Sequence, residues 1–385
     1  MQGFSNNSLG NKLVIMGTAG TENMLKQIEG YIREWRCTPD ENFIVQTSCP
    51  RFSSGEGKGL IKESVRDKDV YILCDCFNYG VEYKMYGRNV PMSPDDHFQD
   101  LKRIISAIGG KASRISVIMP MLYEGRQHRV SGRESLDCAM ALKELEDMGV
   151  ENIVTFDAHD DRIKNAVPFI GFDNLMPTYQ NLKAFVHDYD DVDLSNLIVV
   201  SPDEGALNRG MYYAYVMGIK LSMFYKRRDY SVVENGRNPI VAHEYLGDDV
   251  NGKDIIVVDD ILSTGDSFLH IIDKLKGMGA KRIFGFFSFG LFTNGLEIFD
   301  QYYEKNLFDR IYTTNSVYVT DELKSKKWFT EVNVLKYVAY YIEALNKHNS
   351  VSKLLDSSER INALLAELKA RNTSVNVNQM SIENN

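Results

Sequence analysis

The sequence predicts an α/β protein built from two domains with mainly parallel sheets. Short apolar runs alternate with helical segments along the 385 residues, which is typical of this class. The clearest strand is 255–258, four consecutive β-branched apolar residues that indicate a strand buried in a parallel sheet. The alternation runs through two series, so we expect two similarly built domains that meet near residues 160–175.

The first series follows a polar tail, residues 1–11, which we expect to be flexible. We predict a domain over 12–165, with strands at 13–17, 69–75, 115–119 and 152–157. Helices are expected after a Thr21 cap to about residue 35, and at 97–108 and 135–148. Segment 37–48 reads as irregular. Segment 79–96 reads as an ordered loop because it is rich in tyrosine and proline.

The second series predicts a domain over residues 166–333. Its strands are expected at 197–201, 220–225, 254–258, 282–292 and 311–315, with helices at 205–217 and 267–278. An amphipathic helix at 334–346 is expected to pack back on the first domain. Residues 347–385 form an extension whose polar end, 372–385, we expect to be disordered.

Composition excludes several classes of function. The net charge of −9 leaves no basic excess to neutralise nucleic-acid phosphates, so no nucleic-acid partner is expected. Five cysteines show no CxxC pair, which favours a reducing compartment. No apolar run approaches ~18 residues and no secretory segment opens the sequence. We therefore expect a soluble, cytoplasmic protein without a membrane partner.

The most informative stretch is 254–267, DIIVVDDILSTGDS. The strand is expected to end in Asp259 and Asp260, where open α/β sheets bind their ligands. Ser263, Thr264 and Ser267 surround a flexible glycine, so hydroxyls and backbone N–H groups converge at a helix N-terminus and suit a phosphate. Acids beside a phosphate cradle indicate a phosphorylated sugar. The alternative is an acidic strand end with an ordinary helix cap.

Four other segments are compatible with phosphate chemistry, although each has a plain structural alternative. His159 follows a strand and could be either a metal ligand or a structural histidine. Asp203 and Gly205 open a helix that could cradle a pyrophosphate or be simply capped. The basic run 224–239 could neutralise a transferring phosphoryl group or be a solvated turn. Arg126, Gln127, His128 and Arg129 follow a strand and could bond polyphosphate oxygens and base edges.

Taken in order, six motifs resemble the ribose-phosphate pyrophosphokinases, or PRPP synthetases. RFSSGE (51–56) is similar to an adenine-contacting turn, PMLYEGRQHR (120–129) to an ATP-binding strand end and FDAH (156–159) to a metal-binding segment. SPDEG (201–205) is similar to a pyrophosphate loop, FYKRR (224–228) to a catalytic flexible loop and VVDDILSTGDS (257–267) to a ribose 5-phosphate loop. The resemblance covers about residues 12–356, whereas single-domain phosphoribosyltransferases share only the last one or two motifs. It implies two phosphoribosyltransferase-type, Rossmann-like domains.

The resemblance also implies roles for individual residues. Lys226 and Arg228 would stabilise the transferring group, and His159 and Asp203 would hold Mg²⁺. ATP would be bound by Arg126, Gln127 and His128, with Phe52, Ser54, Gly55 and Glu56 reaching the adenine from a neighbouring subunit of a dimer-based homo-oligomer, up to a hexamer. Ribose 5-phosphate would be bound by Arg228, Asp259, Asp260, Ser263, Thr264, Gly265, Asp266 and Ser267. The implied reaction converts MgATP and ribose 5-phosphate to PRPP and AMP.

Departures from the family pattern keep alternatives open. Ser54 and Ser263 stand where the family has Asp, Asp266 stands where it has Gly, and 79–92 looks like an insertion. An acid beside a phosphate dianion is unfavourable unless it points away or pairs with a cation. One alternative is the same chemistry on another ribose 5-phosphate derivative. A second is a non-catalytic regulatory paralogue, and a PRPP-binding transcription regulator is disfavoured because no basic DNA-reading element is present.

Overall fold

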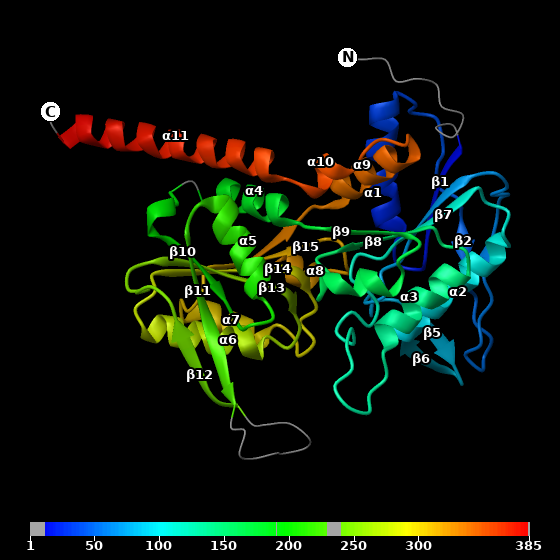
Figure 1. Ribbon diagram of the computed structural model, residues 1–385, viewed down its shortest axis with the longest axis horizontal. Helices are drawn as coiled ribbons and strands as arrows, with labels where there is room; N and C mark the ends of the chain where they lie inside the picture. Colours follow the sequence, from blue (N-terminus) through cyan, green and yellow to red (C-terminus); the bar gives the residue numbers. More distant parts are fainter. Residues whose placement is uncertain (1–11, 190, 229–239, 384–385) are drawn as a thin grey trace. The chain divides into compact units, whose positions relative to one another are not determined.

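The computed structural model describes residues 12–189, 191–228 and 240–383, so the predicted tail 1–11 lies outside the described part. The chain divides into two compact units (Figure 1). The N-terminal unit comprises Met1–Met176, Asn315–Tyr318 and Asn333–Leu355, and the C-terminal unit comprises Pro177–Thr314, Val319–Val332 and Asp356–Asn385. Each unit is built on a mainly parallel sheet, which confirms the predicted fold class. Within the described residues no helix is long and apolar enough to cross a membrane.

The N-terminal unit contains a parallel sheet of order β1-β4-β7-β8-β9. Its strands are Leu13–Gly17, Asp69–Leu73, Arg114–Ile118, Asn152–Phe156 and Gly171–Leu175. Strand β9, GFDNL, is short and only partly buried, so its apolar pattern is weak. Because β9 pairs with β8, it belongs to the N-terminal unit. The boundary between the units therefore lies after Met176, and the predicted boundary at 165/166 is wrong.

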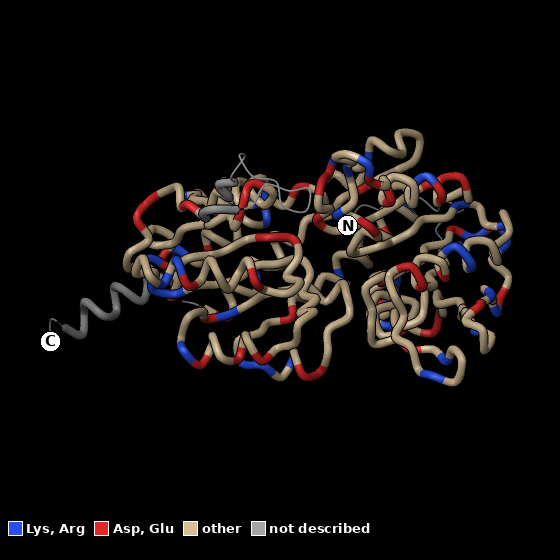
Figure 2. Tube along the Cα trace, turned by 90° about the horizontal axis from the view of Figure 1, so that it is seen from below, with Lys and Arg blue, Asp and Glu red and all other residues tan. Residues whose placement is uncertain are grey.

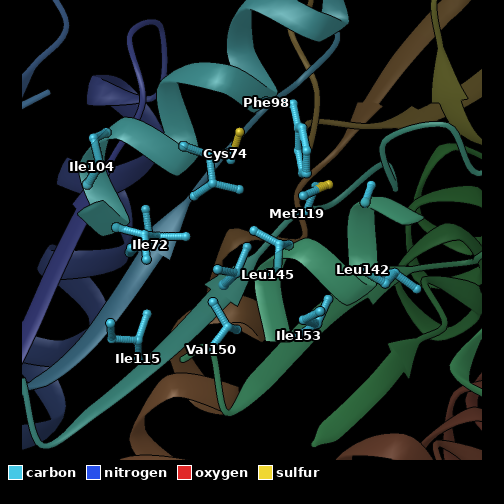
Figure 3. Close-up of a cluster of buried hydrophobic side chains, with 14 of the residues drawn as sticks. Ile72, Cys74, Phe98, Ile104, Ile115, Met119, Leu142, Leu145, Val150 and Ile153 are labelled. Carbon is cyan, nitrogen blue, oxygen red and sulfur yellow. The ribbon is translucent and has the colours of Figure 1, made fainter. Parts of the chain in front are cut away.

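The core of the N-terminal unit lies between this sheet and two helices, α2 (Pro94–Ile108) and α3 (Asp137–Asp147). Phe98 and Ile104 of α2 and Leu145 of α3 are buried in one cluster with Ile72 and Ile153 of the strands (Figure 3). Full burial of such aliphatic side chains contributes roughly 1.5–3 kcal/mol each. Helix α2 begins three residues before the predicted start because Ser93 and Asp96 form a capping box.

Helix α1 (Glu22–Arg36) begins where the sequence predicts it, but Thr21 does not cap it. The Thr21 hydroxyl donates to the Thr18 carbonyl at 2.7 Å instead of accepting from the helix. Helix α9 (Leu335–Asn346) packs against α1 in the N-terminal unit, with Trp35 and Tyr340 edge to face at 5.7 Å. This is the position predicted for helix 334–346.

The segment 79–96, predicted as a loop, is largely a β-hairpin. Strands β5 (Glu82–Met85) and β6 (Arg88–Pro91) pair antiparallel. The two residues that join them, Tyr86 and Gly87, both have positive φ, at 48° and 76°. Two left-handed residues match the twist of a tight hairpin, which explains the glycine. A second small pair, β2 (Thr47–Ser48) and β3 (Leu60–Ile61), completes the strands of this unit.

The C-terminal unit contains a seven-stranded sheet of order β12-β11-β10-β13-β14-β15-β16, in which only β12 is antiparallel. Its strands are, from β10 to β16, Leu197–Ser201, Lys220–Arg228, Ile240–Leu246, Asp254–Leu262, Arg282–Gly290, Arg310–Thr314 and Phe329–Val332. Its helices before the C-terminal extension are α4 Thr178–Asp188, α5 Leu207–Met217, α6 Asp266–Gly277, α7 Glu297–Glu304 and α8 Asp321–Lys324. The described 3-10 turns are Asp161–Ala166 in the N-terminal unit and Leu194–Asn196 in this one.

Strand β13 is longer than predicted. It does not end in Asp259 and Asp260 but continues to Leu262, because β14 extends alongside and pairs Ile261 with Phe289 and Leu262 with Gly290. The acidic pair therefore lies inside the strand. The two acids stay close together, because the Asp260 N–H donates to Asp259 Oδ1 at 2.9 Å and the two side chains also contact one another.

The C-terminal extension is helical and not disordered where it is described. After α10 (Ser352–Leu355), helix α11 runs over Ser358–Glu383 and packs on α4 and α5. Ile361, Leu365 and Leu368 share one helix face and are buried in that contact. Such an anchored segment lets the helix propagate through polar residues, since each added residue forms its own backbone hydrogen bond. Acidic and basic positions are interspersed along the trace in both units (Figure 2).

Candidate active site

In the C-terminal unit, the loop 263–267 joins β13 to the amino end of α6 and borders a small cavity. The cavity measures about 120 Å³. Its lining residues are Pro202, Val257, Asp259, Ile261, Leu262, Ser263, Thr264, Gly265, Ser267, Phe268 and Phe287. Gly265 has φ +90°, and a Cβ there would lie 2.3 Å from the Phe299 ring, so the turn requires glycine. A polar cavity at a helix N-terminus suits an anionic group.

Asp266 belongs to this loop but is not among the cavity-lining residues. Its side chain is exposed, and Oδ2 accepts a hydrogen bond from the Thr264 hydroxyl at 2.9 Å. The Asp266 N–H in turn donates to the Thr264 hydroxyl oxygen at 3.4 Å. The acid that departs from the family pattern thus does not line the cavity that its neighbours Thr264 and Ser267 line.

The two acids of β13 contact each other but have different further neighbours. Asp259 lines the cavity, with Val257 and Ile261 on the same face. Asp260 is buried, and its Oδ2 lies 3.4 Å from the guanidinium of Arg209 on α5. Burial, and then the charge of Asp260, raise the pKa of Asp259 well above its usual range. A carboxylate that is costly to ionise inside a cavity is typical of a ligand-binding position.

Arg209 is the residue of this unit that the sequence reasoning missed. It lies in the quoted stretch SPDEGALNRG, but an arginine in a helix is normally solvated. The available signal was its spacing: α5 buries Arg209 with Tyr213, four residues on, so Arg209 belongs to the buried face. A buried arginine needs an acidic partner, and Asp260 is one.

The Asp203 loop joins β10 to α5 and borders the same cavity through Pro202. Asp203 Oδ1 accepts hydrogen bonds from the N–H groups of Gly205 and Ala206 at 2.9 and 3.2 Å. The negative charge of Asp203 also contributes to the raised pKa of Asp259. The structure therefore brings together two of the predicted segments, the Asp203 loop and the 259–267 segment.

Lys226 and Arg228 were predicted to lie in a flexible loop, but they lie at the carboxyl end of β11. The backbone of β11 pairs Lys226 with His243 and Arg228 with Ile240 of β12, with a register irregularity between Arg227 and Arg228. Antiparallel pairing with β12 therefore extends the strand past the predicted residue 225. The remainder of the predicted loop, 229–239, lies outside the described residues.

In the N-terminal unit, two predicted segments meet beyond the carboxyl ends of β7 and β8. The rings of His128 and His159 lie 5.3 Å apart, and His128 Nε2 is 3.4 Å from Asp160 Oδ2. Hydrogen bonding from Arg162 holds the pKa of Asp160 well below its usual range, whereas burial lowers the pKa of His128. Asp160 is therefore an anion beside a histidine that is neutral at pH 7.

The rest of the predicted ATP segment lies in the same loop. Gln127 is held by the fold: its Nε2 donates to the Ser135 carbonyl at 2.8 Å and its N–H donates to the Glu124 carbonyl at 2.8 Å. Arg126, next to it, is exposed. Because Gln127 is anchored, the exposed Arg126 beside it could present its positive charge to phosphate oxygens.

The 51–57 turn is a separate feature of the N-terminal unit. The Phe52 N–H donates to the Glu56 carbonyl at 2.7 Å, and the Gly55 N–H donates to the Phe52 carbonyl at 2.9 Å. Ser54, one of the departures, donates its hydroxyl to Glu56 Oε2 at 2.8 Å. Phe52 stands out of the turn with 57% of its surface exposed. An exposed aromatic ring on a closed turn could stack on a planar base.

No metal centre is complete within either unit. Among the described residues, no three His, Cys, Asp or Glu side chains are grouped so that they could hold an ion. The two predicted ligands, His159 and Asp203, belong to different units. The assignment of His159 and Asp203 as metal ligands therefore depends on the chemistry of their donor atoms.

Two family models match the chain one after the other. Residues 13–149 match the N-terminal domain of ribose phosphate pyrophosphokinase, and residues 174–321 match the phosphoribosyl transferase domain. The chain belongs to the ribose-phosphate pyrophosphokinase family. The predicted resemblance is therefore confirmed, and the predicted enzyme class with it.

Relatives of this PRPP synthetase homologue are distant but span most of its length. The ribose-phosphate pyrophosphokinase of Vibrio parahaemolyticus is 26% identical over 313 residues, covering 80% of this chain and 90% of the relative. That of Ureaplasma parvum is 27% identical over 272 residues, covering 69% and 78%. The crystal structure of phosphoribosylpyrophosphate synthetase from Mycobacterium smegmatis superposes with a TM-score of 0.70 at 20% identity, covering 88% of this chain and all of that one. This likeness confirms the fold.

Proposed function

We propose that this chain is a ribose-phosphate diphosphokinase, which transfers the β,γ-diphosphoryl group of MgATP to the C1 hydroxyl of D-ribose 5-phosphate. The products are PRPP, a precursor for nucleotide biosynthesis, and AMP. The observation that carries the proposal is the cavity of about 120 Å³ where Asp259 faces the hydroxyl-rich turn 263–267 at the amino end of α6. An acid beside an anion cradle suits a sugar that carries both hydroxyls and a phosphate.

The sugar phosphate is recognised in two parts. Ser263, Thr264 and Ser267 offer hydroxyls to the 5-phosphate, together with the backbone N–H groups at the start of α6. Asp259 accepts hydrogen bonds from ribose hydroxyls. Asp260 does not line the cavity and acts through Arg209, which holds β13 against α5.

The nucleotide is bound by the N-terminal unit. Arg126, Gln127 and His128 contact the polyphosphate, and the 51–57 turn contributes Phe52, Ser54, Gly55 and Glu56 to the adenine. Exposure of Phe52 supports a role in contacting a group outside its own turn. We propose a homo-oligomer in which this turn completes the ATP site of a neighbouring subunit, working in the cytoplasm. Five free cysteines, three of them buried, are compatible with that compartment.

The donor set fits Mg²⁺ in part. Asp203 supplies the hard carboxylate oxygens that Mg²⁺ prefers, and the ion normally completes its shell with water and substrate phosphates. His159 offers a nitrogen, a less typical donor for this ion. When bound, Mg²⁺ would neutralise charge on the polyphosphate oxygens. Asp203 and His159 are the residues that would hold it.

In the transfer itself, the C1 hydroxyl oxygen forms a bond to the β-phosphorus as the bond from that phosphorus to the α-β bridging oxygen breaks. AMP leaves with the bridging oxygen, and the hydroxyl proton passes to solvent. Negative charge grows on the oxygens between the two groups, and Lys226 and Arg228 neutralise it.

An assay of AMP and PRPP formation, with and without ribose 5-phosphate, tests the proposal. We expect both products only with the sugar phosphate. Lys226→Ala should lower kcat by about two to four orders of magnitude with little change in KM, because its charge matters chiefly in the transition state. His159→Ala should weaken the Mg²⁺ dependence of turnover. Absence of AMP with ribose 5-phosphate would contradict the proposal.

The second candidate is the same reaction on another ribose 5-phosphate derivative. Ser263 and Asp266 favour it, because both change the polar groups of the loop that receives the 5-phosphate. Product formation from a derivative, at a higher kcat/KM than from ribose 5-phosphate, would identify this case. A regulatory paralogue is disfavoured because the chain retains His159, Asp203, Lys226 and Arg228.

A further inference from the structure

The β5–β6 hairpin, which lies within the segment 79–92 that looks like an insertion, packs on the 51–57 turn. The Tyr86 N–H at the hairpin tip donates to the Ser53 carbonyl at 2.9 Å. Met85 lies over Gly55 so closely that a Cβ added to this glycine would be 2.7 Å from the Met85 sulfur. Gly55 also has φ +96°, so both its backbone and its space require glycine. The turn therefore takes part of its shape from the hairpin.

A second contact fixes the base of the turn. The Arg51 guanidinium lies 5.0 Å from the centre of the Tyr83 ring and donates to Asp100 Oδ1 at 2.5 Å. Its side chain is only 5% exposed. In a buried place, the attraction of a cation to an aromatic ring and to an acid is stronger than it would be in water. Tyr83 thus covers the ion pair that ties Arg51 to α2.

The hairpin presents one face to the turn and the other to solvent. Tyr83 and Met85 alternate with Glu82 and Lys84, which are exposed. The hairpin itself is held at its start by the edge-to-face contact of Tyr79 with Tyr318, 5.3 Å apart within the N-terminal unit. It is therefore a supported structure and not a loose excursion.

We propose that the β5–β6 hairpin is a positioning element that holds the 51–57 turn in its nucleotide-binding conformation, with Tyr83 and Met85 as its positioning residues. This inference rests on the proposed function, in which the turn contacts the adenine. A turn that is already ordered loses less conformational entropy when the nucleotide binds. The hairpin therefore sets the affinity for ATP and leaves the sugar-phosphate site in the other unit unaffected.

The test compares Tyr83→Ala with Lys84→Ala, its matched control on the solvent face of the same strand. In Tyr83→Ala we expect the KM and the dissociation constant for ATP to rise about tenfold. Its kcat and its KM for ribose 5-phosphate should stay within about threefold of wild type. Tyr83→Phe keeps the ring over Arg51 and should restore ATP affinity. Lys84→Ala should match wild type throughout.

Hydrogen exchange adds a readout that activity does not provide. The Phe52 and Gly55 N–H groups, which close the turn, should exchange faster in Tyr83→Ala and in a second variant, Met85→Ala, and not in Lys84→Ala. Unchanged exchange and unchanged ATP affinity in folded Tyr83→Ala and Met85→Ala would overturn the inference. So would equal losses for ATP and ribose 5-phosphate, since these would indicate general destabilisation.

The proposed function is judged separately, by PRPP formation in the wild-type protein. If wild type binds ATP and forms no PRPP, the function fails, whereas weaker ATP binding by Tyr83→Ala still supports the hairpin's role. If wild type forms PRPP and Tyr83→Ala binds ATP equally well, the function stands and the hairpin inference is wrong. If wild type binds no ATP, both are wrong.

Discussion

The two ends of strand β13 carry the same residue type in opposite circumstances. At the amino end, Asp254 is buried and accepts two hydrogen bonds from Arg282 of β14, from Nε at 3.0 Å and from a terminal nitrogen at 2.6 Å. At the carboxyl end, Asp259 and Asp260 are adjacent, and burial with mutual repulsion raises the pKa of Asp259. At the amino end, the charge of Asp254 is neutralised by the paired Arg282. At the carboxyl end, ionisation of Asp259 is unfavourable.

The N-terminal unit repeats the arrangement of the amino end. Asp69 begins β4 and accepts two hydrogen bonds from Arg114 at the start of β7, at 2.8 and 2.7 Å. In both units the acid and the arginine are register partners on neighbouring strands. Asp69 and Asp254 stabilise the fold, whereas the carboxyl-end pair lowers stability and forms part of a candidate site. Position along the strand therefore separates structural acids from candidate ligand-binding acids.

The largest effect should come from breaking the amino-end pair. Arg282→Met leaves Asp254 buried without its guanidinium, so we expect the free energy of unfolding of the C-terminal unit to fall by about 3–5 kcal/mol. Of the two tryptophans in the chain, Trp328 is buried in this unit and Trp35 lies in the other. Denaturant unfolding followed by Trp328 fluorescence, in a Trp35→Phe background, measures the change.

Removing both members of that pair is the control. Asp254→Leu combined with Arg282→Met leaves no buried unpaired charge, since the second partner of Arg282, Asp191, is exposed, so much of the lost stability should return. A fall of less than about 1 kcal/mol for Arg282→Met alone would place this ion pair among those that contribute little. The structural reading of the amino end would then be wrong.

The carboxyl end should respond in the opposite way. Asp259→Asn removes a repulsive charge and a carboxylate that faces the cavity. We expect kcat/KM for ribose 5-phosphate to fall by roughly 10- to 100-fold, the loss of a hydrogen bond to a charged group, about 1.5–3 kcal/mol. Stability by Trp328 fluorescence should stay the same or rise.

Asp260→Asn separates the two acids. Because Asp260 pairs with Arg209 and does not line the cavity, this change should lower stability more than Asp259→Asn does and affect the sugar-phosphate KM less. If both variants lose activity equally without loss of stability, both acids contact the sugar, and the contact of Asp260 with Arg209 does not separate their roles.

Local patterns predicted the centre of this site, and contacts from distant residues decided the rest. The run 255–258 is β-branched and could be assigned at sight, and the hydroxyls of 263–267 follow it directly. Two acids in succession look like a strand end, yet β14 supplies backbone partners as far as Gly290. Arg209 was missed because its role depends on which face of α5 is buried.

The edges and insertions were the least predictable parts. Strands β12 and β16 lie at the two edges of their sheet, where half of the backbone groups need no neighbour and the apolar pattern is weak. The 51–57 turn has almost no local signal of function. Its shape depends on Tyr83 and Met85, about thirty residues further along the chain, and single-sequence patterns do not contain such contacts.

The pH dependence of stability should sharpen the same comparison. The folded-state pKa of Asp259 is raised, so the folded protein binds this proton more tightly than the unfolded chain. The contribution is present in full below the unfolded pKa of about 3.9 and is lost as pH rises through the raised folded value. Relative to Asp259→Asn, the wild-type C-terminal unit should therefore gain stability on acidification, by at most about 1.4 kcal/mol per pH unit. A pH-independent difference would contradict this.

The smallest effect is expected from the acid just beyond the strand. Asp266 is exposed, does not line the cavity and accepts a hydrogen bond from Thr264, so Asp266→Gly should change the KM for ribose 5-phosphate by less than about tenfold, or ~1.4 kcal/mol. Ser267→Ala, which removes a cavity-lining hydroxyl, is the matched reference and should cost about 1.5–3 kcal/mol. Asp266→Asn keeps the shape and isolates the charge. Suppose instead that Asp266→Gly converts a feeble ribose 5-phosphate enzyme into an efficient one. The acid would then be selecting against that sugar phosphate, and another ribose 5-phosphate derivative would be the natural substrate.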